Sequence, residues 1–266
     1  MSSTGGRLSQ LFLRFAPSMA GLRRLPVVGS LLGWASGKLV PRDALTWVQV
    51  RGGAAEGIWL HLNPRTGKGY FDGGGEPEVQ AALCEHLKPG MTFYDIGANI
   101  GFFSLLAARI VGEKGRVVAF EADPEVAARL REHAARNQAA IVSVEEKAVW
   151  SEPRTVFFSR TDPKTSPDRG LGHVVKSGSK DTIEVQGVSL DEFLKTGPEP
   201  DFVKCDVEGA EVEVFRGAER LLEEKRPGIL CELHSEENRR VLLEEFSRHR
   251  YGCKDLDENH ILALPQ

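Results

Sequence analysis

The sequence predicts an α/β fold with a mostly parallel sheet and helices on both of its faces. Two observations carry this prediction. From Thr92 onward, short apolar runs alternate with longer amphipathic segments, and this alternation is typical of βαβ units. In addition, a loop bounded by Gly97 and Gly101 separates the first apolar run from the first helix, as in the ligand-binding loops of open parallel sheets.

A hairpin and a helix are expected ahead of the sheet. Alternating apolar residues in the segment 46–70 predict the hairpin. The segment 76–88 begins with two acids and a proline and is followed by Pro89 and Gly90, which are start and stop signals of a helix. The elements of the sheet then follow in order. They are strand 92–96, helix 101–111, strand 116–121, helix 124–137, strand 141–149, strand 201–207, helix 209–224, strand 227–233, helix 236–250 and a strand pair within 251–264.

The segment 151–190 interrupts this alternation. Two β-rich pieces, 155–160 and 182–190, enclose a polar stretch that contains several prolines and glycines. Turn-rich segments near the ligand-binding edge of a sheet often contact substrate, so we expect such contacts here, with His173 among them.

The charge is distributed unevenly along the 266 residues. Residues 1–40 contain five basic residues and no acid, and because the whole chain carries −4, the remainder carries −9. A body this acidic disfavours binding to nucleic acid, which requires basic surface. The four cysteines form no C-x-x-C pair, and Cys205 and Cys231 lie in apolar runs, so we expect reduced thiols in a cytoplasmic protein.

The basic arm, residues 1–45, contains no acid in its first 40 residues and precedes a single catalytic domain, residues 46–266. The longest uncharged run of the arm, 25–37, has 13 residues and is too short to span a bilayer. We expect an arm that is packed on the domain as a helical flap or partly disordered. Peripheral membrane contact through residues 1–40 and an organellar presequence remain as alternatives.

The glycine loop favours one cofactor over others. A dinucleotide loop requires G-x-G-x-x-G, whereas Gly97 and Gly101 lie four residues apart, and no Gly-Lys-Ser/Thr is present. Asp95 before the loop disfavours a pyrophosphate and favours a cationic amine, as in S-adenosylmethionine. We therefore expect Asp95 to bind the amino group, the loop with Asn99 to approach the cofactor closely, and Glu121 to accept the ribose hydroxyls.

Acidic residues at two later strand ends are expected to face the same crevice. Asp206 is expected to accept a proton from the substrate or to hold a metal ion. Glu208 and Glu211 fit equally well in the first turn of a helix, where acids complement the helix dipole.

Glu232 and His234 lie two residues apart on a strand and should point to the same face. We expect His234 to act as a base assisted by Glu232, although His234 also suits the start of the next helix. With Asp206, the pair offers Mg²⁺ three ligands, but histidine is unusual for that metal, so Mg²⁺ stays open as a cofactor and no metal ligand is assigned.

The remaining histidines have no matching partners in the sequence, and we expect surface or packing roles for them. They are His61, His86, His133, His249 and His260.

These motifs together resemble the FkbM family of S-adenosylmethionine-dependent methyltransferases. The matching pieces are GGGEPE, DIGANIGFFS, FEADP, VSLDEFL, KCDVEGAEVEVFRGA and ILCELH, in the family's order within residues 70–234. The resemblance implies a class I methyltransferase-like Rossmann fold, with a seven-stranded sheet whose last strand is antiparallel. By the same analogy, one group of residues matches the cofactor loop and ribose acid, and another matches the late motifs. The first group is Asp95, Gly97, Asn99, Gly101 and Glu121, and the second is Asp206, Glu208, Glu232 and His234.

The resemblance further implies O-methylation of a hydroxyl on a sugar, polyketide, lipid or other small metabolite. Residues 1–45 have no counterpart in the family. Two alternatives of other classes remain. A NAD-dependent oxidoreductase is disfavoured by the glycine spacing, and a non-catalytic, membrane-associated protein that binds S-adenosylmethionine is disfavoured by the acids at both motifs.

Overall fold

The computed structural model describes residues 45–63, 66–160, 172–175, 177–178 and 182–266. The predicted arm therefore lies outside the described residues, apart from residue 45. Most of the polar stretch within 151–190 lies outside them as well.

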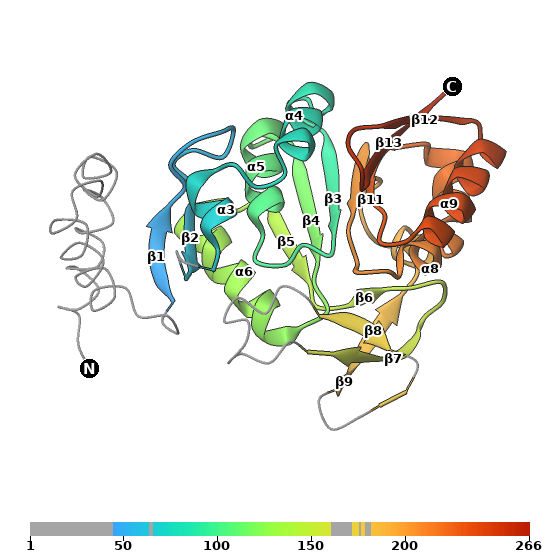
Figure 1. Cartoon of the computed structure of the whole chain (residues 1–266), viewed down its shortest axis with the longest axis horizontal. Coiled ribbons are helices and arrows are strands. Elements are labelled where there is room, and N and C mark those ends of the chain that lie inside the picture. The colour runs from blue at the N-terminus through green and yellow to red at the C-terminus, as the bar shows by residue number, and fades with distance from the viewer. Residues whose placement is uncertain (1–44, 64–65, 161–171, 176, 179–181) are drawn as a thin grey trace, which may run out of the picture.

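The central layer is a sheet of seven strands (Figure 1). They are β3 (Thr92–Ile96), β4 (Arg116–Phe120), β5 (Val142–Glu145), β10 (Phe202–Cys205), β11 (Gly228–Glu232), β12 (Tyr251–Asp255) and β13 (His260–Pro265). Their spatial order is β12-β13-β11-β10-β3-β4-β5. β13 is antiparallel to both of its neighbours, and the pairs from β11 to β5 are parallel. The predicted seven-stranded sheet with an antiparallel last strand is confirmed.

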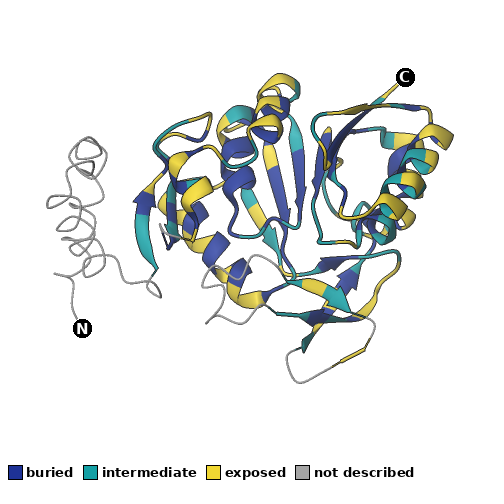
Figure 2. Ribbon diagram, in the orientation of Figure 1, coloured by how far each residue is buried: buried dark blue, intermediate teal, exposed yellow. Residues whose placement is uncertain are grey.

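Helices cover both faces of this sheet. They are α3 (Lys68–Asp72), α4 (Pro77–His86), α5 (Phe102–Val111), α6 (Pro124–Arg136), α7 (Leu190–Phe193), α8 (Glu211–Arg216), the π-helical turn η2 (Leu221–Lys225) and α9 (Glu236–Arg248). Successive residues of a strand point to opposite faces. Accordingly, Phe93 of β3 joins a core with α4 and α5, whereas Tyr94 joins a second core with α8 and α9. Figure 2 shows the buried central strands between helices whose outer surfaces are exposed.

Two smaller sheets complete the described part. The predicted hairpin is formed by β1 (Thr46–Gln49) and β2 (Trp59–Leu62), which pair antiparallel. The second sheet has the order β6-β9-β7-β8, with β6 (Ala148–Val149), β7 (Arg154–Ser159), β8 (His173–Val175) and β9 (Thr182–Val188). It includes both β-rich pieces of the segment 151–190.

Two predicted elements are interrupted in the structure. The strand expected over 141–149 divides into β5 and β6, because Ala148 pairs with Gly187 of the second sheet. The helix expected over 209–224 breaks at Gly217, where a Cβ would lie 2.5 Å from the carbonyl oxygen of Trp150. The sequence also did not predict α3 or β8.

The thiols of Cys205 and Cys231 are buried and free, as expected. Within the residues that the structure describes, no helix has both the length and the apolar character needed to cross a membrane.

Candidate active site

The predicted motifs meet at one edge of the main sheet. The chain passes from β3 through β4 to β5 and then returns to place β10 on the other side of β3. The strand order therefore reverses between β3 and β10, and open α/β sheets bind ligands beyond the carboxyl ends of strands at such a point. Gly97 directly follows β3 and Asp206 directly follows β10.

Glycine is required at both ends of the first loop, for reasons internal to the protein. Gly97 has a φ of +75°, and a Cβ on it would lie 1.7 Å from the carbonyl oxygen of Asp206. Gly101 has a φ of +85°, and its Cβ would lie 2.7 Å from Cγ of Leu130. The sequence predicted close approach of this loop to the cofactor. At Gly97 the nearest obstacle to a Cβ is instead the backbone that follows β10, so the two motifs constrain each other.

Glu121 is fixed at the tip of β4 by backbone donors. The N–H groups of Asn99 and Asp123 each donate to its carboxylate, at 2.8 Å. The residue is 8% exposed, and burial raises the pKa of Glu121 to about 7, although these two hydrogen bonds oppose the rise. Near neutral pH this carboxylate thus sits at the midpoint of its titration, with its two oxygens already oriented.

A pocket lies between the main sheet and the second sheet. Gly97, Asn99 and Glu121 line one side of it, Phe158 lines another, and Asp206 contributes at the end of β10. The space between these walls, including the solvent at the open mouth, is about 660 Å³. The side-chain oxygen of Asn99 is buried and has no hydrogen-bond partner among the described residues. An unpaired polar atom on a wall that also carries Glu121 fits a nucleoside-bearing cofactor.

Asp95 lies beneath the loop and is not a lining residue of this pocket. It is fully buried, its Oδ2 accepts a hydrogen bond from Ser104 at 2.5 Å, and its Oδ1 has no hydrogen-bond partner among the described residues. Lys204, its neighbour across β3 and β10, has Nζ 4.0 Å from Oδ1. Burial raises the pKa of Asp95, and the charge of Lys204 opposes this rise.

Lys204 connects the two motifs. Its ammonium group is 3.2 Å from Oδ2 of Asp206, and the side chain is 2% exposed. Burial by itself lowers the pKa of Lys204, but the carboxylates of Asp206 and Asp95 outweigh burial and raise it. In turn, burial raises the pKa of Asp206, and Lys204 more than reverses this and lowers it. Both side chains are therefore charged at neutral pH.

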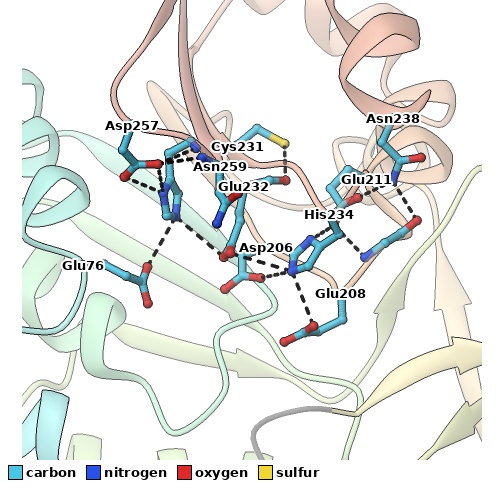
Figure 3. Close-up of polar contacts among 12 residues, drawn as sticks. Glu76, Asp206, Glu208, Glu211, Cys231, Glu232, His234, Asn238, Asp257 and Asn259 are labelled. Atoms are coloured by element: carbon cyan, nitrogen blue, oxygen red, sulfur yellow. Dashed lines mark hydrogen bonds and ion pairs between the residues drawn. The ribbon is translucent and has the colours of Figure 1, made fainter. Parts of the chain in front are cut away.

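His234 is held by Glu211, for which the sequence left open whether it has a functional role. Its Nδ1 lies 2.8 Å from Oε1 of Glu211, which is fully buried and also accepts from Asn238 at 2.7 Å. Its Nε2 faces Oε2 of Glu208 at 3.4 Å and Oδ1 of Asp206 at 3.9 Å (Figure 3). The hydrogen bond that Nδ1 of His234 donates to Glu211 is the main cause that raises the pKa of His234 to about 9.

Glu232 lies between two histidines. One oxygen is 3.8 Å from Nε2 of His234, and the other is 3.6 Å from Nε2 of His260. The expectation that His260 has no matching partner is therefore wrong, because it also contacts Asp257 and Glu76.

His133 has the expected packing role. This side chain is fully buried, donates from Nδ1 to the carbonyl oxygen of Ile100, and accepts at Nε2 from the N–H of His61. His173 is exposed on β8 and does not line the pocket, although its neighbours Gly172 and Val174 do.

The structure thus brings part of the predicted cofactor group, Gly97, Asn99 and Glu121, into one pocket with Asp206. Asp95 and Gly101 do not line it, and Glu232 and His234 lie near Asp206. Glu211 and Lys204 lie in the predicted late motif, but the sequence did not reveal their partners. Glu76, Asp257 and His260 were missed as site residues, although Glu76 stands in the GGGEPE element.

Comparisons with known proteins show the family to which the chain belongs. A model of the methyltransferase FkbM domain matches residues 95–253. Hexuronic acid methyltransferase AglP of Haloferax volcanii is 29% identical over 163 residues, which cover 60% of this chain and 63% of that protein. Arsenite methyltransferase of Halobacterium salinarum is 28% identical over 144 residues, which cover 50% of this chain and 34% of that protein. The chain therefore spans less than two thirds of either relative.

Among solved structures, the FkbM methyltransferase of Methylobacillus flagellatus overlaps with a TM-score of 0.49 at 19% identity. The overlap covers 66% of this chain and 43% of that protein.

Proposed function

Because the chain belongs to the family defined by the methyltransferase FkbM domain, we propose that it transfers a methyl group from S-adenosylmethionine to a hydroxyl group of a small molecule. One observation carries the proposal: Glu121 and Asp206, from the two motifs, line the same pocket. The first is placed to accept the hydroxyls of a ribose, and the second to accept a proton.

The cofactor side of the pocket is assigned to the loop after β3 and the tip of β4. Glu121 accepts the two ribose hydroxyls, with its carboxylate held by two backbone N–H groups. Asn99 supplies a buried amide oxygen that lacks a partner among the described residues. Asp95 stays the proposed partner of the amino group, since its Oδ1 accepts no hydrogen bond from the described residues, although it does not line the pocket.

S-adenosylmethionine supplies an electrophilic methyl group when it is bound. The protein then has to align the acceptor hydroxyl and to remove its proton. Of the three predicted catalytic residues, Asp206 alone lines the pocket, and we assign proton acceptance to it. A carboxylate suffices, because a hydroxyl becomes strongly acidic as its oxygen gains the methyl group. His234 and Glu232 are assigned to positioning, since both lie within 4 Å of one another and His234 faces Asp206.

A sugar is the acceptor class that the comparisons favour. The relative with the longer match is named a hexuronic acid methyltransferase, so we propose a uronic acid or a related sugar hydroxyl as the acceptor. Polyketides, lipids and other metabolites remain as the wider class. Mg²⁺, a cytoplasmic location and membrane contact through residues 1–40 stay predictions from the sequence.

The test is methyl transfer with a panel of acceptors. The full chain is incubated with S-adenosylmethionine labelled in the methyl group, and with glucuronic and galacturonic acid glycosides, neutral hexosides and a simple polyketide alcohol. We expect label in a uronic acid product, and loss of at least 100-fold in turnover for Asp206→Asn with unchanged cofactor affinity. Label on nitrogen or carbon, or full activity of Asp206→Asn, would contradict the proposal.

A further inference from the structure

Three side chains from separate parts of the chain converge next to Asp206. Glu76 precedes α4, Glu232 ends β11, and His260 begins β13. Glu232 and His260 are direct partners in the antiparallel pair β11–β13, so their side chains lie on the same side of the sheet. Figure 3 shows Glu76, Glu232 and Asp257 around one imidazole ring, which is that of His260.

The imidazole lies between two carboxylates without a hydrogen bond to either of them. Nε2 of His260 is 3.6 Å from Oε2 of Glu76 and 3.6 Å from Oε2 of Glu232, and both distances are too long for a hydrogen bond. His260 is 5% exposed, yet its Nε2 has no hydrogen-bond partner among the described residues. The same holds for the buried Oε2 of Glu76. Nε2 of His260 and Oε2 of Glu76 thus face each other at the distance of an ion pair but without a hydrogen bond, and a divalent cation between them would give both atoms a ligand bond.

The distances fit two ligands of one metal ion. Nitrogen and oxygen ligands lie about 2.1 Å from a first-row divalent metal, and a separation of 3.6 Å between them then gives a ligand–metal–ligand angle of about 118°. Such an angle is compatible with tetrahedral or five-coordinate geometry. One ligand atom from each of the three residues lies within 4.8 Å of the other two.

Asp257 orients the imidazole for this role. Its carboxylate accepts from Nδ1 of His260 at 2.8 Å, and it is itself fixed by the backbone N–H groups of Asn259 and His260, each at 2.8 Å. A carboxylate on Nδ1 directs the lone pair of Nε2 toward the two glutamates. This carboxylate–histidine pair is the usual outer support of a metal-bound histidine.

We propose that Glu76, Glu232 and His260 bind one divalent transition-metal ion. One imidazole with two carboxylates suits Mn²⁺, Fe²⁺, Co²⁺ or Zn²⁺, whereas Mg²⁺ and Ca²⁺ prefer oxygen ligands alone. Three protein ligands leave coordination positions for water or for substrate oxygen atoms. Glu232 also contacts His234, which faces the proposed proton acceptor Asp206, so the ion would lie near the site of proton transfer.

A second set of ligands, formed by Asp206, Glu232 and His234, also lies within 4.8 Å. It is the weaker candidate, because none of its side-chain atoms is both buried and unpaired. Asp206 is neutralised by Lys204, and Nδ1 of His234 is already bonded to Glu211.

The test is titration of the metal-free full chain with Co²⁺ and with Mg²⁺, by calorimetry and by visible absorption of bound Co²⁺. The measurement needs neither cofactor nor acceptor, so its result is independent of the proposed function. We expect one equivalent of Co²⁺ to bind, with Mg²⁺ at least tenfold weaker. Glu76→Gln and His260→Gln should each weaken Co²⁺ binding at least tenfold, and Asp257→Asn should weaken it about tenfold.

His234→Gln is the matched control, since it changes the histidine of the other set, and its affinity for Co²⁺ should match that of the wild type. Circular dichroism checks that each variant is folded. Absence of Co²⁺ binding by the wild type would overturn the proposal. The proposal would also be overturned if His234→Gln lost Co²⁺ binding while Glu76→Gln or Asp257→Asn retained it.

Discussion

The titration of Glu121 predicts a pH dependence of cofactor affinity. Burial raises the pKa of Glu121 to about 7, and only the ionised carboxylate accepts a hydrogen bond at both oxygens without donating one. With a pKa of about 7, the ionised fraction is about 90% at pH 8 and about 10% at pH 6. If the ribose hydroxyls require the ionised form, affinity falls about tenfold from pH 8 to pH 6.

The assay must exclude titration of the ligand. S-adenosylmethionine and S-adenosylhomocysteine carry an amino group, so 5′-methylthioadenosine is the better probe, because it keeps the ribose and lacks the amino acid tail. Its dissociation constant is measured by calorimetry between pH 6 and pH 8. The control is Glu121→Gln, which cannot ionise and should bind weakly with no dependence on pH.

Two results would refute this reasoning. An affinity of the wild type that is constant between pH 6 and pH 8 would mean that Glu121 does not take the ribose in ionised form. If the affinity of Glu121→Gln still changed tenfold between pH 6 and pH 8, the titrating group would be a residue other than Glu121.

Three further predictions concern the loop, a buried histidine and the acidic end of the pocket. Gly97→Ala should unfold at a lower urea concentration than Gly57→Ala and should lose cofactor binding. Both glycines have a positive φ, which costs about 1–2 kcal/mol for alanine, but of the two only Gly97 has backbone atoms within 4 Å of the added Cβ. Equal urea midpoints of the two variants would contradict this prediction. Burial lowers the pKa of His133 to about 4 from an ordinary 6.5, so its contribution is complete above pH 6.5 and is lost as the pH falls toward 4. The contribution of His133, about 2 kcal/mol, should disappear between pH 7.5 and pH 5, so the difference in free energy of unfolding between the wild type and His133→Gln, measured by urea denaturation, should fall by about this amount over the range. His234→Gln should lower kcat at least tenfold with unchanged affinity for S-adenosylhomocysteine, and wild-type turnover in this variant would exclude the positioning role next to Asp206.

The sequence predicted the main sheet because its elements depend on local patterns. Strand 92–96 agrees with β3 at both ends, and the helix expected over 101–111 is α5 with one residue fewer. Apolar periodicity, prolines at helix starts and the glycine loop are all short-range signals. The break at Gly217 was not predicted, although glycine is a common stop signal. The close approach of Gly217 to the backbone of Trp150, far away in the sequence, has no local signal.

The candidate site was predicted only where its residues belong to short-range patterns. Motif residues such as Asp206 and Glu121 stand at strand ends, which the pattern reveals. Lys204 sits inside an apolar run, and a lysine there is tolerated because Asp95 lies directly opposite on β3. His260 meets Glu232 only through the register of β11 and β13. The pattern of a single sequence does not show which residues of two neighbouring strands pair with each other, so these partners could not be predicted.

The most direct test of the account is calorimetric titration of the full chain with S-adenosylhomocysteine and, in parallel, with NADH. We predict one-to-one binding of S-adenosylhomocysteine, at least tenfold weaker binding in Glu121→Ala, and no binding of NADH. Binding of NADH without S-adenosylhomocysteine, or an unchanged affinity in Glu121→Ala, would contradict the assignment of the pocket between Gly97 and Glu121 to S-adenosylmethionine.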